Sequence, residues 1–266
     1  KEKIVCIIQA RVNSKRLPGK ILMDIQGKQC IERVIDRVKS CKEITEIWLA
    51  TTSLKSDLVL AKIAKEKKIN FFKGSNKNVL SRFFFISKKT NANIIIRVTG
   101  DCPLIDPGLI KKGLQFFKTK NYDYVSNTIK RTYPDGLDVE IFSNSTLEKA
   151  YRNSKNPFLL EHVTPYIHGN SFKSFPKGNF SIGQFRNDTL FRFKETDSVT
   201  CAIAKNGLLE SEIVTNYYGW KDGGQATDLT SSISIQAGSA LTTHKLEPKE
   251  IVRFGHGTTV GTNALI

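Results

Sequence analysis

The amino-acid sequence predicts an α/β protein in which a mostly parallel sheet lies between two layers of helices. Two observations predict this fold class. In residues 1–125, short β-branched or aromatic runs alternate with runs that show helical spacing of apolar residues. One strand-like run, "NIIIRV" (93–98), is apolar at nearly every position, as expected of a central strand covered on both faces. Strand–helix–strand alternation is typical of parallel strands joined by crossover helices, so we expect a three-layer arrangement.

The predicted strands are short and bounded by polar residues. They are "KIVCIIQ" (3–9), "TEIWLATT" (45–52), "INFFKG" (69–74), "NIIIRVTG" (93–100) and "YDYVSN" (122–127). The predicted helices between them cover residues 30–41, 56–68, 78–90 and 107–120. Ser56-Asp57 and Asp106-Pro107 are typical of helix starts, where an N-cap residue precedes an acid or a proline.

The second half of the chain gives weaker patterns. Residues 132–142 indicate a turn and a strand, and residues 156–169 are mostly helical in pattern. Residues 169–188 are rich in Gly, Asn, Ser and Phe without a clear period, which predicts a loop or linker.

Composition excludes several classes of protein. No apolar run approaches the roughly 20 residues that span a bilayer. The first residues do not resemble a signal peptide, so we expect a cytoplasmic protein without a membrane partner. The five cysteines form no C-x-x-C pair, which argues against a zinc site or a disulfide framework.

The net charge of +16 raises the possibility of a nucleic-acid partner. Many lysines, however, are spread singly along amphipathic stretches such as "AKIAKEKK" (61–68), a pattern typical of a solvated helix face. No nucleic-acid-binding signature is present. We therefore expect no nucleic-acid partner, and a nucleoside triphosphate explains the focused part of the charge better.

The most focused charge follows the first predicted strand, in "QARVNSKRLPGK" (9–20). This stretch contains four cations and no acid: Arg11, Lys15, Arg16 and Lys20. Loops at the carboxyl ends of parallel strands bind ligands, and cations with backbone N–H groups suit a triphosphate. The glycine-lysine pattern of a P-loop is absent. A basic surface loop is the alternative interpretation.

A second loop at the same predicted edge, "VTGDCPLID" (98–106), contains Asp101 directly after a glycine. A single carboxylate there suits Mg²⁺, which binds one or two carboxylates together with phosphate oxygens and water. The alternative is a carboxylate that caps the next helix. Asp106 fits that alternative better because it directly precedes Pro107.

Four segments together resemble the cytidylyltransferase family. They are "QARVNSKRLPGKIL" (9–22), "VTGDCPLIDP" (98–107), "SNTIKRTYPDGLDVEIFS" (126–143) and "EHVTPYI" (161–167). The resemblance covers residues 1–168 and is to the spore-coat polysaccharide biosynthesis branch, which is related to acylneuraminate and 3-deoxy-manno-octulosonate cytidylyltransferases. It implies a Rossmann-like nucleotide-diphosphosugar-transferase fold. It also implies a Mg²⁺-dependent enzyme that moves CMP from CTP to a sugar or sugar acid for surface polysaccharide or glycan, releasing pyrophosphate.

The resemblance also implies roles for individual residues. Triphosphate binding would fall to Arg11, Ser14, Arg16 and Lys20, with Arg11, Lys20 and Asp101 as catalytic residues and Asp101 as a metal ligand. Asp135, Asp138 and Glu140 would bind acceptor hydroxyls, and Glu161 with His162 would close the site or supply a base. For His162, an ordinary helix side chain is the interpretation that we favour. A homodimer is expected from the resemblance alone.

The C-terminal third departs from this family. The usual second metal motif is altered in "FRFKETDSVTCAIA" (191–204), where Asp197 is the nearest carboxylate. The segments 222–229 and 256–266 resemble a fragment of the hydantoinase/oxoprolinase N-terminal region. We therefore predict a nucleotidyltransferase domain over residues 1–220 and a separate tail over 221–266. The alternatives are a nucleotide-sugar-dependent glycosyltransferase and a catalytically impaired nucleotide-binding protein.

Overall fold

The computed structural model describes residues 2–14, 17–133, 135–169, 176–187, 198–205 and 208–216. The chain divides into two compact units. The larger unit comprises Lys1–Lys130 and Leu137–Arg186, and the smaller unit comprises Arg131–Gly136 and Asn187–Ile266. No helix of the described residues is long and apolar enough to cross a membrane.

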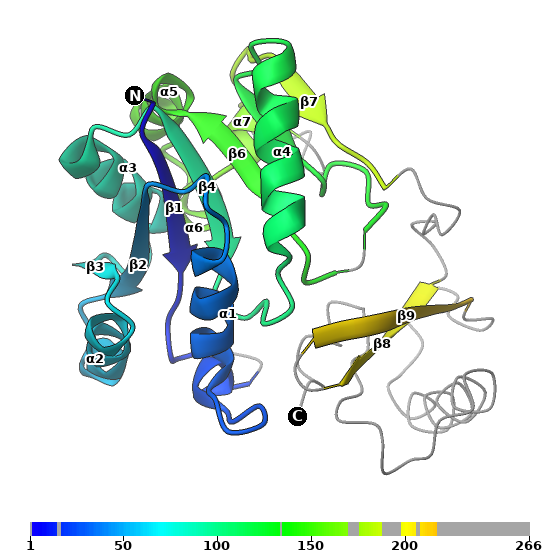
Figure 1. Ribbon diagram of the computed structural model, residues 1–266. Coiled ribbons are helices and arrows are strands. Elements are labelled where there is room, and N and C mark those ends of the chain that lie inside the picture. The colour runs from blue at the N-terminus through cyan, green and yellow to red at the C-terminus, as the bar shows by residue number, and fades with distance from the viewer. Residues whose placement is uncertain are drawn as a thin grey trace, which may run out of the picture. The chain divides into compact units, whose positions relative to one another are not determined.

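The larger unit contains a seven-stranded sheet with strand order β3-β2-β1-β4-β6-β5-β7. The strands are β1 (Ile4–Gln9), β2 (Glu46–Thr52), β3 (Asn70–Gly74), β4 (Ile94–Thr99), β5 (Tyr124–Ser126), β6 (Glu140–Ser143) and β7 (Ile182–Gln184). Strands β3, β2, β1 and β4 are parallel, whereas β6 runs antiparallel to both β4 and β5. The predicted mostly parallel α/β fold is confirmed (Figure 1).

Helices cover both faces of this sheet. The helices are α1 (Cys30–Lys39), α2 (Leu58–Glu66), α3 (Val79–Thr90), α4 (Pro107–Thr119), α5 (Asn144–Asn153), α6 (Pro157–His162) and α7 (Pro165–His168), with 3-10 turns η1 (Lys20–Leu22) and η2 (Lys55–Asp57). In Figure 1, α1 and α4 cross in front of the sheet and α3 and α5 lie behind it.

Strand β1 lies at the centre of the core. Each residue from Ile4 to Ile8 is buried, although alternate side chains point to opposite faces. Val5 and Ile7 belong to the core cluster that also contains Phe83 of α3 and Leu147 of α5. The continuous apolar run is therefore required because both faces of β1 are covered.

Both predicted helix starts are found, but only one of them has a side-chain cap. Asp106 caps α4, since its carboxylate accepts a hydrogen bond from the Gly108 N–H at 2.8 Å. Helix α2 begins at Leu58, and the Asp57 side chain makes no capping hydrogen bond. The Asp57 carboxylate instead accepts a hydrogen bond from the Val12 N–H at 2.8 Å, so a contact distant in sequence replaces the local one.

The prediction of a loop over residues 169–188 is wrong for residues 182–184. Ile182–Gln184 forms β7 and pairs in parallel with β5. Gly183 is buried there, and a Cβ at this position would lie 2.9 Å from both Phe116 and Tyr122 ring carbons. A strand that is held by backbone pairing around a buried glycine has no alternating apolar pattern, so the sequence gives no sign of it.

In the smaller unit, β8 (Ser198–Lys205) and β9 (Leu208–Asn216) form an antiparallel hairpin. The predicted domain boundary at residue 220 and both tail segments lie outside the described residues. The division into residues 1–220 and 221–266 therefore stays a prediction.

Candidate active site

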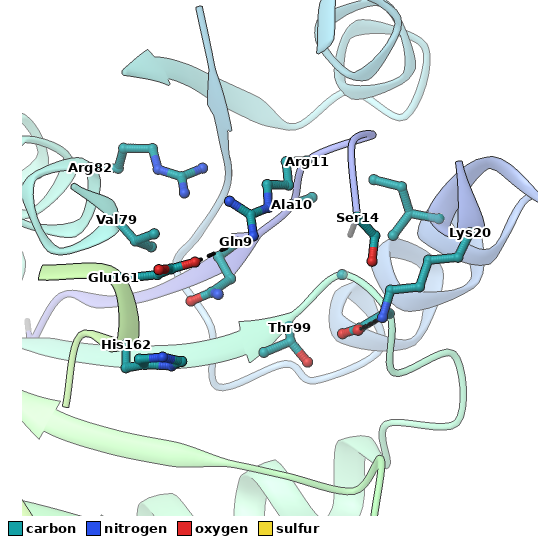
Figure 2. A pocket seen from close by; sticks show the side chains of 13 residues that line it. Gln9, Ala10, Arg11, Ser14, Lys20, Val79, Arg82, Thr99, Glu161 and His162 are labelled. Atoms are coloured by element: carbon teal, nitrogen blue, oxygen red, sulfur yellow. Dashed lines mark hydrogen bonds and ion pairs between the residues drawn. The ribbon is translucent and has the colours of Figure 1, made fainter. Parts of the chain in front are cut away.

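A cavity of about 250 Å³ lies in the larger unit at the carboxyl ends of β1 and β4 (Figure 2). Its lining comes from the loop after β1, the loop after β4, the first turns of α3 and the end of α6. The lining residues are Gln9, Ala10, Arg11, Ser14, Lys20, Ile21, Val79, Arg82, Thr99, Gly100, Asp101, Glu161 and His162. This is the edge of a parallel sheet at which α/β proteins bind ligands.

A buried carboxylate holds the loop after β1 in place. Asp57 is 1% exposed, and it accepts hydrogen bonds from the Val12 N–H and from both the N–H and the hydroxyl of Thr52. The Val12 carbonyl in turn accepts the Gly19 N–H at 3.0 Å, which closes the loop on itself. Gly19 has a φ of +75°, a backbone conformation that favours glycine.

This loop places three of its predicted ligand residues on the cavity: Arg11, Ser14 and Lys20 all line it. Arg16 and Lys15 lie outside the described residues. Two of the four grouped cations, Arg11 and Lys20, therefore lie on a concave surface. A cavity, rather than an open surface, favours the ligand-binding interpretation over a solvated basic loop.

Lys20 and Asp101 form an ion pair across the cavity wall, with side chains 12% and 29% exposed. Burial would raise the pKa of the Asp101 carboxyl. The Lys20 ammonium, together with hydrogen bonds from Lys20, Thr99 and the Asp101 backbone, outweighs burial and lowers that pKa. Asp101 is consequently a carboxylate at neutral pH. Gly100 allows this placement, because a Cβ on it would lie 2.9 Å from the Ala10 Cβ.

Arg11 lines the cavity from the loop after β1. Its guanidinium is 3.4 Å from a Glu161 carboxylate oxygen and 3.5 Å from the Asn76 amide oxygen. Glu161 lines the cavity, and its role in closing the site or binding the acceptor stays a prediction. Its neighbour His162, the last residue of α6, also lines the cavity. Burial holds the pKa of His162 below its usual value, so the imidazole is neutral at pH 7.

Two lining residues make contacts that the sequence does not indicate. Arg82 of α3 is 2% exposed and donates from Nη1 to the Ala50 carbonyl at 2.9 Å. Gln9, the last residue of β1, accepts a hydrogen bond on its amide oxygen from Arg97 Nε at 3.0 Å. In the sequence, the only sign of Arg82 is its place among Val79, Phe83 and Ile86 on an otherwise apolar helix face.

Glu140 does not line the cavity, and its carboxylate already has partners inside the larger unit. It pairs with Arg97 and accepts hydrogen bonds from the Tyr124 hydroxyl at 2.7 Å and the Thr164 hydroxyl at 2.6 Å. Burial would raise the pKa of Glu140, but the Arg97 charge and these hydrogen bonds lower it. In this structure the carboxylate positions Arg97, and the expected acceptor-binding role of Glu140 stays a prediction.

The other expected acceptor ligands are placed as follows. Asp138 is half-buried and does not line the cavity, and the groups on either side of it, the Leu137 carbonyl and the Val139 N–H, bond to the Asn127 side chain. Asp135 belongs to the smaller unit, where it pairs with Arg131 at 3.1 Å. Asp197 lies outside the described residues. Roles for these three residues stay predictions.

Within the described ranges, no three His, Cys, Asp or Glu side chains gather in a way that could hold a metal ion. Asp101 and Glu161 are the two carboxylates on the cavity. One or two carboxylates suffice for Mg²⁺ when phosphate oxygens and water complete its shell. The donor set therefore fits a Mg²⁺ ion that arrives with a phosphorylated ligand.

A sequence profile described as Cytidylyltransferase matches residues 5–213. A second profile, a domain of unknown function (DUF4861), matches residues 172–263. The resemblance of the tail to the hydantoinase/oxoprolinase region stays a prediction. The two profiles overlap in residues 172–213, so this segment matches both.

Individual proteins show the same similarity. The chain is 40% identical to an uncharacterised protein of Methanocaldococcus jannaschii, over 65% of this chain and 71% of that protein. It is 31% identical to the spore coat polysaccharide biosynthesis protein SpsF of Bacillus subtilis, over 62% and 69% respectively. It is 32% identical to the 3-deoxy-manno-octulosonate cytidylyltransferase of Escherichia coli, over 80% and 99% respectively.

A solved structure agrees with these matches. A cytidylyltransferase from Leptospira borgpetersenii is 31% identical and superposes with a TM-score of 0.65, over 71% of this chain and 77% of that chain. The similarity thus extends from sequence to three-dimensional fold.

The Lys20–Asp101 pair gives a stability prediction. Lys20→Met should lower the free energy of unfolding by about 1–3 kcal/mol at pH 7, because it leaves a half-buried carboxylate without its cation. Since the folded-state pKa of Asp101 is lowered, its contribution is fully present above the ordinary value of 3.8 and is lost as the pH falls through the folded-state pKa. Urea unfolding at several pH values measures both effects.

Two further variants control this experiment. Lys28→Met removes a more exposed ion pair, with Asp36, and should change stability by at most about 1 kcal/mol. Lys20→Met/Asp101→Asn removes the uncompensated charge and should recover part of the loss. Equal instability of the single and double variants would contradict the assigned pairing.

Proposed function

Because the chain belongs to the cytidylyltransferase family, we propose that it transfers CMP from CTP to a sugar or sugar acid and releases pyrophosphate. The product would serve surface polysaccharide or glycan biosynthesis, as the name of the Bacillus subtilis relative suggests. The observation that carries the proposal is the Lys20–Asp101 pair on a cation-lined cavity at the carboxyl ends of β1 and β4. A cytoplasmic location and a homodimer stay predictions.

Three loop residues are suited to the triphosphate. Lys20 and Arg11 supply positive charge from the two sides of the loop, and the Ser14 hydroxyl supplies a neutral donor. The leaving pyrophosphate gains negative charge during the reaction, so fixed cations stabilise the transition state more than the bound substrate. Asp57 holds the loop before substrate arrives, which lowers the cost of ordering these groups on binding.

The reaction forms one bond and breaks one bond. An acceptor hydroxyl oxygen bonds to the α-phosphorus, the bond between the α-phosphorus and the bridging oxygen breaks, and pyrophosphate leaves with the electron pair. The hydroxyl proton must pass to a base. The neutral imidazole of His162 lines the cavity and is able to accept it at pH 7.

Asp101 is the residue that we propose as the Mg²⁺ ligand, with substrate phosphates completing the shell. A bound Mg²⁺ would neutralise phosphate charge and polarise the phosphoryl oxygens. Lys20 keeps the Asp101 carboxylate ionised in the absence of the ion, so the carboxylate is ready to bind a cation. Asp197 lies outside the described residues, and no step of the proposed reaction involves it.

Release of pyrophosphate tests the proposed function. The full chain with CTP and Mg²⁺ should release pyrophosphate at least about tenfold faster when a sugar acid such as 3-deoxy-manno-octulosonate or an acylneuraminate is added. CMP-sugar should form in equal amount, as measured by chromatography. Reactions with no acceptor are the control. Formation of product from a nucleotide-sugar donor, with none from CTP across sugars and sugar acids, would instead favour a glycosyltransferase.

The proposed metal ligand gives a second prediction. Asp101→Asn should lower kcat by about 100-fold or more while far-UV circular dichroism stays unchanged, because the charge that binds Mg²⁺ is lost. EDTA should abolish the activity of the parent protein, and added Mg²⁺ should restore it. Asp106→Asn, at the other end of the same loop, is the matched control and should keep normal activity because an asparagine still caps α4. Full activity of Asp101→Asn would assign the metal to another residue.

A further inference from the structure

Arg82 is an unusual residue for the helix that contains it. It lies on the face of α3 that packs into the core, between Val79 and Phe83, and it is 2% exposed. A charged side chain in such a position is costly unless it has polar partners. Its guanidinium nevertheless reaches the cavity wall. A residue that is both buried and placed at a cavity is a candidate for binding what enters the cavity.

The side chain is fixed in position before any ligand binds. Its stem lies against Gly74 so closely that a Cβ at that glycine would be 2.8 Å from the Arg82 Cγ. Its Nη1 donates to the Ala50 carbonyl. Among the described residues, however, its buried Nε has no hydrogen-bond partner. A guanidinium has five N–H donors, so the hydrogen-bonding capacity of Arg82 is only partly used within the protein.

The charge around Arg82 is also unbalanced. Burial and the neighbouring Arg11 cation lower the pKa of Arg82 to about 10, and the Asp57 carboxylate opposes them. Arg82 therefore remains a cation at neutral pH. Two cations, Arg11 and Arg82, lie near each other, and Asp57 is already bonded to Val12 and Thr52. An anionic group placed between the two arginines would stabilise both.

The position of Arg11 and Arg82 in the cavity indicates which anionic group of the ligand would lie between them. Figure 2 shows Lys20 and Arg82 at opposite ends of the residues drawn, with Arg11 and Gln9 between them. In the proposed function the Lys20 end takes the leaving pyrophosphate. The phosphate that extends toward Arg82 is then the one attached to the nucleoside, which the acceptor hydroxyl attacks.

We propose that Arg82, together with Arg11, binds the non-bridging oxygens of the CTP α-phosphate. This inference rests on the proposed function and adds to it a residue that contacts the reacting phosphorus centre. Because Arg82 is held by Gly74 and Ala50, its charge needs little reorganisation when the hydroxyl attacks. The two ends of the cavity thus divide the triphosphate between them: Lys20 at the leaving group and Arg82 at the group that is transferred.

Isothermal titration of three ligands tests this division in the full chain. Arg82→Lys keeps the charge but withdraws the guanidinium, and it should weaken binding of both CTP and CMP about tenfold or more. Binding of inorganic pyrophosphate should stay within about twofold of the parent protein. CMP contains the α-phosphate without the leaving group, whereas pyrophosphate is the leaving group without the α-phosphate. Comparing the two ligands therefore distinguishes an effect at the Arg82 end of the cavity from an effect at the Lys20 end.

Arg37→Lys is the matched control. Arg37 is also a partly buried guanidinium that donates to a backbone carbonyl, that of Ile105, but it lies on α1 and does not line the cavity. It should leave the affinity for all three ligands unchanged. Arg82→Gln serves as a second variant if Arg82→Lys is unfolded without ligand. Crystals of the parent protein with CMP give a readout that needs no variant: a guanidinium nitrogen within about 3.2 Å of a phosphate oxygen.

Several results would overturn the inference. Normal CTP and CMP affinity in Arg82→Lys would exclude the contact, as would an equal loss of pyrophosphate affinity. A loss for CMP but not for UMP would assign Arg82 to the base instead of the phosphate. In each of these cases the parent protein still binds CTP, so the proposed function stands. If the parent protein itself fails to bind CTP, the proposed function and this inference are both wrong.

Discussion

The parallel pairing of β1 with both β2 and β4 is the constraint on which the candidate site depends. Because the three strands run in the same direction, the loops that leave β1 and β4 meet at one edge of the sheet. The pairing holds only if β1 is covered on both faces, which explains its uninterrupted apolar sequence. Lys20 and Asp101 are distant in sequence but become neighbours through this pairing.

Buried charge then fixes the site more firmly than the loops alone would. Asp57 holds the loop after β1 through the Val12 N–H, and Lys20 holds Asp101 as a carboxylate. Arg97, itself held by Glu140, fixes the amide of Gln9. Each arrangement removes conformational freedom from a group at the cavity before ligand binds, which is the property that a site for phosphoryl transfer requires. The cost is a set of buried ionic groups that must all be paired.

The sequence predicts what is local and does not predict what depends on distant contacts. Helices α1, α2, α3 and α4 and strands β1, β2, β3 and β4 follow from periodicity, and the loop after β1 is recognisable from its charge. The role of Asp57 cannot be recognised from the sequence, because its position before a helix also suits a helix cap. Arg82 is hidden in the apolar face of α3, and Glu140 lies in a motif that suggests a ligand although its partners are Arg97, Tyr124 and Thr164. Strand β7 gives no pattern because a buried glycine replaces the apolar residue.

Whether the cation-lined cavity is a CTP site is measured most directly by thermal unfolding of the full chain. The unfolding is followed with each of CTP, UTP, ATP and GTP, with and without Mg²⁺. A nucleotide at about 100 times its Kd stabilises the folded state by roughly 2.7 kcal/mol, which is readily measured. We expect a Mg²⁺-dependent rise in Tm with CTP that exceeds the rise with the other three nucleotides. No rise with any nucleotide, or an equal rise with all four, would contradict it.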